Sequence, residues 1–477
     1  MSFRGKKESS PVSPLKKRRA SWSELWLNHH NLLSSSPPPP LQFQSLTPPI
    51  SNSKTLLPDL TLLLSDLTLL TIINKIPKSQ RKILSLVCKR WFKLHGCLVR
   101  SIKVSDWEFL ASGKMISRFP NLDTVDLVSG CLISQPNSGV LLNHRLVSFT
   151  VGLGSYQSWI EENLLCVEMV DIGLSKLADG CLNLRKLVVT NTSELGLLNV
   201  AEVCLRLQEL ELHKCSDTVL LGIGAFENLQ ILRLVGNVDG LCSNSLVSDI
   251  GLMILAQGCK RLVKLELVGC EGGFDGVKEI GECCQMLEEF TVCDHKMDSG
   301  WLEGLRYCEN LKTLKLVSCK KIDYDNAGLG ECLSGCCPAL ERLHLEKCQL
   351  RDKNTVKALF KMCEAAREIV FQDCWGLDND IFSLATAFGR VKLLYLEGCS
   401  LLTTPGLESV ILHWHELEHL KVVSCKNIKD SEISPSLSAL FSALVEFQWR
   451  PDTRSHLSSS LMETGIGKKG SKFFKKT

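Results

Sequence analysis

Apolar residues recur from about residue 120 onward in the pattern Leu-x-x-Leu-x-Leu-x-x-Cys. The copies closest to this pattern are LQELELHKC (207–215), LVKLELVGC (262–270), LKTLKLVSC (311–319), LERLHLEKC (340–348) and LEHLKVVSC (417–425). Degenerate copies begin at Leu122, Leu146, Leu184, Leu229, Leu287, Ala366, Val391 and Leu444. The thirteen starts are about 27 residues apart on average, a period typical of a repeat architecture.

Each unit combines two hydrophobic periods. The Leu-x-Leu core predicts a short strand whose alternate residues point inward. The preceding stretch, as in 249–262, places Ile250, Ile254, Leu255 and Cys259 at helical spacing. Because no unit can bury its own apolar face, the units are expected to stack into a solenoid. The spacing lengthens near 152–170 and 236–250, which predicts surface insertions or loops that overhang the sheet.

Cysteines follow the same period. Fourteen of the 23 cysteines occupy two repeat positions, three residues before or eight residues after the first leucine. They are Cys181, Cys204, Cys259, Cys284, Cys308, Cys337 and Cys363, and Cys215, Cys270, Cys319, Cys348, Cys374, Cys399 and Cys425. A small, weakly polar side chain suits a tight interior turn. A zinc cluster is the alternative, but the cysteines recur once per coil rather than as Cys-x-x-Cys pairs.

Residues 120–450 resemble the cysteine-containing subclass of leucine-rich repeats found in F-box proteins, including those of plants. This resemblance implies an α/β leucine-rich-repeat solenoid, a horseshoe with parallel strands on its concave face. Within each strand, the residue between the second and third leucine should then point onto that face. These residues are Glu211, Arg233, Glu266, Thr291, Lys315, His344, Val370, Tyr395, Lys421 and Gln448.

Residues 56–98 do not follow the repeat. Leu69, Ile72, Ile73 and Ile76 form one helical apolar stripe that Pro77 should end. A second stripe, Ile83, Leu84, Val87 and Trp91, predicts a second helix. So short a segment cannot bury all of these side chains by itself. It either caps the first repeat or presents an apolar face to a partner.

The stretches LSDLTLLTIINKIP (64–77) and KSQRKILSLVCKRWFKL (78–94) resemble an F-box, and we expect an all-α F-box ahead of the solenoid. Two residues depart from the family pattern, Ser65 in place of Pro and Leu67 in place of Glu; Asp66 could still cap the helix. The resemblance implies docking on a Skp-type adaptor and, through it, a cullin. The implied contact residues are Leu64, Asp66, Leu69, Leu70, Ile73, Ile76, Pro77, Val87, Cys88 and Trp91.

Both ends of the chain differ from its centre. Residues 1–55 are rich in Pro and Ser and, like the basic residues 451–477, are expected to be disordered tails flanking the F-box (56–98) and the repeats (99–450). The run Lys16, Lys17, Arg18 and Arg19 is either a nuclear-import signal or a solvated charge cluster. We therefore expect the nucleus, the cytoplasm or both as the location.

Overall composition excludes several classes of protein. The chain of 477 residues is 44% hydrophobic and 22% charged, which is typical of a globular protein. The net charge is only +3, and the two ends of the chain are basic while its body is mildly acidic. This balance argues against a nucleic-acid partner. No apolar signal segment opens the chain, and Asp59 and Asp66 interrupt Leu56–Ile73, so no membrane partner is expected.

Two short motifs mimic catalytic ones. HELEH (415–419) matches a zinc-protease pattern, but Leu417 and Leu420 open a repeat, so the chain should turn from helix into strand there. GIGKKG (465–470) lies in a basic tail without a βαβ unit. The sequence therefore predicts no catalytic residue, no metal and no cofactor.

The resemblance implies the substrate-recognition subunit of a Skp–cullin–F-box ubiquitin ligase, a non-enzymatic component that binds an unidentified protein substrate. Mixed charge and the aromatic Tyr395 on the later strands favour a substrate site at Lys315, His344, Tyr395 and Lys421. A solvated surface is the alternative at these positions. Two other functions stay open, a repeat scaffold that recruits no ligase and a small-molecule co-receptor.

Overall fold

The computed structural model describes residues 60–132, 164–236, 247–297, 299–319, 321–322 and 337–452. The chain divides into two compact units. In the first, Met1–Leu63, the described part is the short 3-10 helix η1 (Leu60–Leu63). The second unit, Leu64–Thr477, contains all other described elements.

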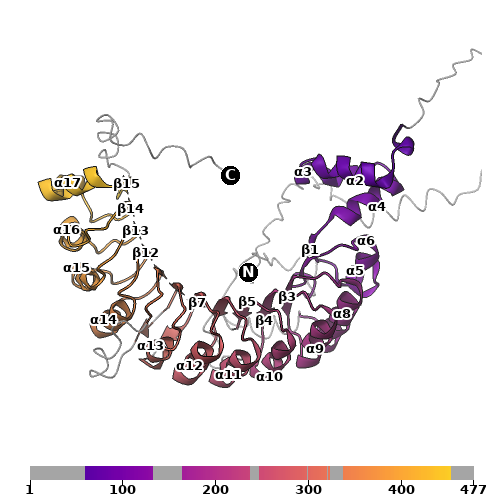
Figure 1. Ribbon diagram of the computed structural model, residues 1–477, viewed down its shortest axis with the longest axis horizontal. Helices are drawn as coiled ribbons and strands as arrows, with labels where there is room; N and C mark the ends of the chain where they lie inside the picture. Colours follow the sequence, from indigo (N-terminus) through magenta and orange to yellow (C-terminus); the bar gives the residue numbers. More distant parts are fainter. Residues whose placement is uncertain are drawn as a thin grey trace, which may run out of the picture. The chain divides into compact units, whose positions relative to one another are not determined.

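A parallel sheet runs through the second unit, with thirteen strands within the described ranges (Figure 1). They are β1 (Ser101–Lys103), β2 (Thr124–Asp126), β3 (Lys186–Thr190), β4 (Glu209–His213), β5 (Ile231–Val235), β6 (Lys264–Val268), β7 (Glu289–Cys293), β9 (Thr313–Val317), β11 (Arg342–Glu346), β12 (Glu368–Gln372), β13 (Leu393–Glu397), β14 (His419–Val423) and β15 (Glu446–Arg450). A small parallel pair, β8 (Lys296–Met297) and β10 (Lys321–Ile322), lies apart from it. The sheet order follows the chain order, as in a solenoid.

Helices follow the strands and cover one face of the sheet (Figure 1). They are α5 (Trp107–Ala111), α6 (Lys114–Arg118), α8 (Val167–Gly180), α9 (Glu194–Val203), α10 (Asp217–Leu220), η2 (Leu221–Ala225), α11 (Asp249–Gly258), α12 (Phe274–Cys283), α13 (Ser299–Leu305), α14 (Lys353–Met362), α15 (Asn379–Ser383), η4 (Leu384–Ala387), α16 (Thr404–Ile411), η5 (Asp430–Glu432) and α17 (Pro435–Ala443). We call the opposite face the open face of the sheet.

The core lies between the sheet and these helices. In β4, Leu210 and Leu212 are buried, while Glu211 and His213 are partly exposed. The predicted inward alternation is therefore confirmed. In α11 the buried side chains are Leu252, Leu255 and Ala256, whereas Ile250 of the predicted stripe lies exposed in the first turn of the helix.

The sheet corrects the predicted set of repeats at its beginning. Strand β1 was not anticipated, since Ser101–Lys103 lacks the leucine pattern. The copy expected at Leu146 lies outside the described residues. However, Val125 of β2 is the register partner of Leu187 of β3. Strands β2 and β3 are therefore direct neighbours in the sheet.

A residue with a left-handed backbone conformation follows most strands, and the tight turn that it forms favours the small cysteine that comes next. Lys214, Ser318 and Lys347 have φ between 51° and 54°, and each immediately precedes a buried cysteine. The thiol of Cys348 donates to the carbonyl oxygen of Leu316 in the preceding coil at 3.3 Å. All fourteen repeat-position cysteines are buried, as predicted. A side chain this small fits the turn and ties adjacent coils together.

We expect two classes of cysteine in a thiol-labelling experiment on the native protein. Burial raises the pKa of Cys204 to about 11 and that of Cys215 to about 12, so neither forms the reactive thiolate near neutral pH. Cys88 and Cys166 are exposed and should be alkylated first by iodoacetamide at pH 7.5, as followed by peptide mass spectrometry. Labelling of Cys215 as fast as Cys88 in the native protein would contradict this assignment.

Carboxylates at the starts of helices connect consecutive coils. Asp217 accepts hydrogen bonds from the Ser248 amide (2.8 Å) and the Ser248 hydroxyl (2.6 Å) of the next coil. The next helix, α11, has a glycine where it passes this carboxylate. A Cβ atom at Gly251 would lie only 2.1 Å from the Asp217 carboxylate. The same relation holds for Asp171 with Gly196.

Gly251→Ala should therefore destabilise the protein, although this change in a helix normally stabilises by up to about 1 kcal/mol. We expect the free energy of unfolding to fall by about 1–3 kcal/mol, because the Asp217 carboxylate must leave Ser248. Denaturant unfolding measures the change. Gly389→Ala is the control, since a Cβ atom there meets nothing within 4 Å. If Gly251→Ala is as stable as this control, the carboxylate does not constrain the helix.

Candidate functional site

Three helices precede the first repeat strand: α2 (Asp66–Lys75), α3 (Lys78–Leu84) and α4 (Lys89–Leu98). The hydroxyl of Ser65 caps α2 by accepting a hydrogen bond from the Thr68 amide at 3.2 Å. The expected cap at Asp66 is therefore wrong. The Asp66 carboxylate instead accepts from the Arg90 guanidinium at 2.7 Å, which joins the start of α2 to α4.

Proline ends α2 as predicted, but the following helix is not continuous. Ile76 closes α2, and Pro77 precedes α3. The single helical stripe predicted from Ile83 to Trp91 is wrong, because α3 ends at Leu84 and Cys88 is fully extended with φ −160°. Leu86 and Val87 therefore lie in a connection between helices rather than on a helical stripe.

The predicted adaptor contacts occupy different environments. Leu69 and Ile73 are buried and, with Leu94, form the centre of a small core. Leu64, Leu70 and Trp91 are half-buried around it. Ile76 is also half-buried, whereas Asp66, Pro77, Val87 and Cys88 are exposed. The buried pair therefore holds the three helices together and is not accessible to a partner.

Apolar side chains are nevertheless plentiful on the surface of this segment. Six large ones are between 42% and 77% exposed, namely Leu67, Ile72, Ile83, Leu86, Val87 and Phe92. Of these six side chains, only Val87 was among the predicted contacts. Leu67 and Ile72 share α2 with Leu69 and Ile73, which turn inward. Which side of α2 is buried follows from its packing against α4, and the sequence pattern alone does not show it. So many exposed apolar groups are typical of an interaction surface.

Close contacts join α4 to the first coil. The Arg118 guanidinium lies 3.4 Å from the centre of the Phe92 ring and donates a hydrogen bond to the Phe92 carbonyl. The Asn121 amide donates to the Cys97 carbonyl at 2.9 Å. Gly96 is required here, since a Cβ atom would lie 2.1 Å from the Arg118 carbonyl oxygen. The helical segment is thus packed directly against the repeats.

On the open face, the predicted central positions form one continuous row. Each is the register partner of the next, and all are partly exposed. The row is Glu211, Arg233, Glu266, Thr291, Lys315, His344, Val370, Tyr395, Lys421 and Gln448. The alternation of the sequence therefore located this row correctly.

In the later strands this row is joined to a second one, two residues further along each strand. His344 is hydrogen-bonded to Gln372 at 2.8 Å, and Gln372 donates to Glu397 at 2.8 Å. The Tyr395 hydroxyl also donates to Glu397. The second row was missed at the sequence level, although the same alternation of two residues could have found it.

Basic side chains close this network at both ends. Lys315 forms an ion pair with Glu346 at 3.3 Å, and the Lys421 ammonium lies 4.0 Å from the centre of the Tyr395 ring. The four predicted substrate residues are thus brought together through Glu346, Gln372 and Glu397. We call these seven residues the sheet-face network.

The protonation states within the network follow from its contacts. Burial and the nearby Lys315 charge lower the pKa of His344, so its imidazole is neutral near neutral pH. Burial and the hydrogen bond to Glu397 raise the pKa of Tyr395 to about 12, which keeps its hydroxyl protonated. The Tyr395 and Gln372 donors lower the pKa of Glu397. At these positions the network therefore holds fixed hydrogen-bond donors and acceptors.

An analogous cluster lies on the earlier strands. The Arg233 guanidinium bridges Glu211 (2.8 Å) and Glu266 (3.0 Å), and His213 contacts Glu211 at 2.8 Å. Every charged group of this cluster is paired within it. It lacks an aromatic side chain comparable to Tyr395.

The HELEH stretch is no helix. Helix α16 ends at Ile411, and His419 is the first residue of β14, so His415 and His419 share no helical face, as predicted. Within the described ranges, no three His, Cys, Asp or Glu side chains are placed to hold a metal ion.

The run Lys16–Arg19, the GIGKKG motif and most of the two insertions lie outside the described residues. None of the described helices is long and apolar enough to span a membrane.

Comparison with known proteins adds little to this geometry. No protein-family model matches the chain. A chain in the crystal structure of a TLR13–ssRNA13 complex is similar with a TM-score of 0.40 and 17% identity. The match covers 71% of this chain but only 41% of that one. The fold therefore rests on its own sheet, an α/β solenoid of leucine-rich repeats, an architecture typical of protein-binding scaffolds.

Proposed function

We propose that this protein is the substrate-recognition subunit of a Skp–cullin–F-box ubiquitin ligase. The proposal rests above all on the helical segment, which resembles an F-box in sequence and carries six exposed apolar side chains. A Skp-type adaptor would cover them and connect the chain to a cullin. The change from Pro to Ser at position 65 is compatible with this role, because Ser65 still caps α2.

The chain itself would perform no chemistry. It would raise the local concentration of substrate lysines near a ubiquitin-loaded enzyme. Such a mechanism benefits from a stiff connection between the docking and recognition parts. The Arg118–Phe92 stack and the close approach at Gly96 support such a connection.

The sheet-face network is the proposed substrate site. Tyr395 offers an aromatic anchor beside the Lys421 charge, and His344 and Lys315 extend the polar surface along neighbouring strands. Aromatic and charged groups of this kind dominate the energetics of protein interfaces. The substrate would be a protein, and Lys16–Arg19 would direct the chain to the nucleus.

Affinity purification from cells with the proteasome blocked tests the proposal. We expect a Skp-type adaptor and a cullin in stoichiometric amounts, together with proteins whose abundance rises on proteasome inhibition. Direct binding of the purified chain to a recombinant adaptor provides a second measurement. Recovery of stable partners without any adaptor would instead identify a repeat scaffold that recruits no ligase.

A further inference from the structure

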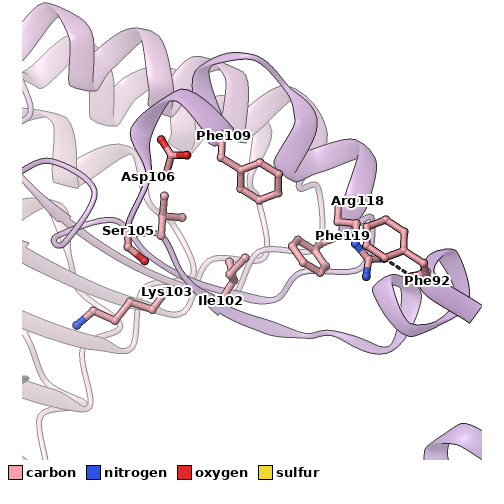
Figure 2. Close-up of a pocket in the computed structure, with 9 residues that line it drawn as sticks. Phe92, Ile102, Lys103, Ser105, Asp106, Phe109, Arg118 and Phe119 are labelled. Atoms are coloured by element: carbon pink, nitrogen blue, oxygen red, sulfur yellow. Dashed lines mark hydrogen bonds between the residues drawn. The ribbon is translucent and has the colours of Figure 1, made fainter. Parts of the chain in front are cut away.

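A pocket of about 330 Å³ lies where helix α4 meets the first coil. Its walls are mostly apolar and come from α4, β1, α5 and the end of α6. Figure 2 shows the rings of Phe109 and Phe119 and the side chain of Ile102 around the same space. The size is near the lower end for small-molecule sites, and apolar walls with few polar groups are typical of them.

Arg118 supplies a cation at one end of this pocket. Its guanidinium lies between the rings of Phe92 and Phe119, with ring-centre distances of 3.4 and 5.0 Å. One nitrogen donates to the Phe92 carbonyl. Within the described part of the chain, no carboxylate pairs with it and no other acceptor takes its remaining N–H groups. A guanidinium held this way is suited to receive a carboxylate from a ligand.

The two other charged groups of the pocket have partners of their own. Asp106 caps α5 by accepting a hydrogen bond from the Glu108 amide at 3.1 Å, and Lys103 pairs with Asp126 at 3.6 Å. Both lie at the opposite end from Arg118 in Figure 2. The negative charge of Asp106 is therefore kept away from the guanidinium.

We propose that this pocket binds a free small aromatic carboxylate, with the ring system against the walls formed by Ile102 and the edge-to-face pair Phe109 and Phe119, and the carboxylate on Arg118. The apolar walls account for the aromatic part. The unpaired guanidinium accounts for the charge. This site is separate from the sheet-face network and does not depend on the proposed ligase role.

Ligand-observed NMR titration of the full chain tests this site with 1-naphthoate as the probe and 1-naphthamide as its neutral counterpart. We expect saturable binding of the naphthoate and about tenfold or more weaker binding of the amide, since the amide cannot accept a charge-assisted hydrogen bond. Equal affinities, or no saturable binding of naphthoate, would overturn the proposal.

Two variants locate the binding. Arg118→Met keeps an unbranched side chain against Phe92 and should weaken naphthoate binding about tenfold or more. Lys114→Met removes the same charge from an exposed position of the same helix and should leave the affinity unchanged. Circular dichroism shows whether each variant is folded.

Ser105→Phe covers the case in which Arg118→Met fails to fold. Ser105 is exposed at the pocket wall, so a large side chain there should block the ligand without disturbing the core. Wild-type affinity in the folded Ser105→Phe variant would place the ligand elsewhere. Tighter binding of an acetylated dipeptide ending in phenylalanine than of naphthoate would identify a peptide terminus as the occupant and overturn the free-ligand assignment.

Discussion

Replacing Leu86 and Val87 together by glutamate is expected to weaken adaptor binding by about 100-fold or more while the repeats stay folded. Both side chains lie in the exposed connection between α3 and α4, outside the core formed by Leu69, Ile73 and Leu94. Covering each of them would contribute roughly 1.5–3 kcal/mol, and a buried glutamate adds a desolvation cost. Titration with a recombinant Skp-type adaptor measures the loss.

A matched control uses exposed apolar residues of the solenoid. Leu195→Glu with Ile250→Glu changes α9 and α11 in the same way and should leave adaptor affinity unaltered. Leu69→Ala should also lose the adaptor, but through unfolding of the helical segment, at a cost of about 2–5 kcal/mol. If the Leu86/Val87 variant binds as tightly as the wild type, these residues lie outside any adaptor interface.

Combining Tyr395→Ala with Lys421→Glu should lower substrate recovery about tenfold or more while adaptor binding is retained. The first change removes the aromatic anchor. The second places a new carboxylate beside Glu397, where the Lys421 ammonium lies against the Tyr395 ring. Because both side chains are partly exposed, we expect the free energy of unfolding to change by no more than about 1 kcal/mol. Quantitative mass spectrometry of co-purified proteins provides the measurement.

The earlier strands provide the control for this experiment. Arg233→Ala with Glu266→Ala removes an ion pair from the same row of the sheet and should leave the captured proteins unchanged. The opposite outcome, loss of partners from the control and retention by the Tyr395/Lys421 variant, would move the substrate site to the cluster around Arg233. Retention by both would move it off the open face.

Local pattern alone determined much of this protein. The Leu-x-x-Leu-x-Leu copies located the strands of the main sheet from β2 to β15 and the row from Glu211 to Gln448, because alternation along a strand fixes which side chains face the core. The period of the cysteines predicted their burial for a similar reason. One set follows the left-handed residue after a strand, as at Lys214 and Lys347, and the other set lies between a helix and the next strand, as at Cys204 and Cys259.

Contacts between segments distant in sequence decided the rest. Whether Leu69 faces a partner or the core depends on where α4 packs. The bridge from His344 through Gln372 to Glu397 likewise spans three strands. A hydrophobic period specifies which side of its own element a residue occupies. It does not specify which residue of another helix or strand packs against it, since that is set by how successive coils stack.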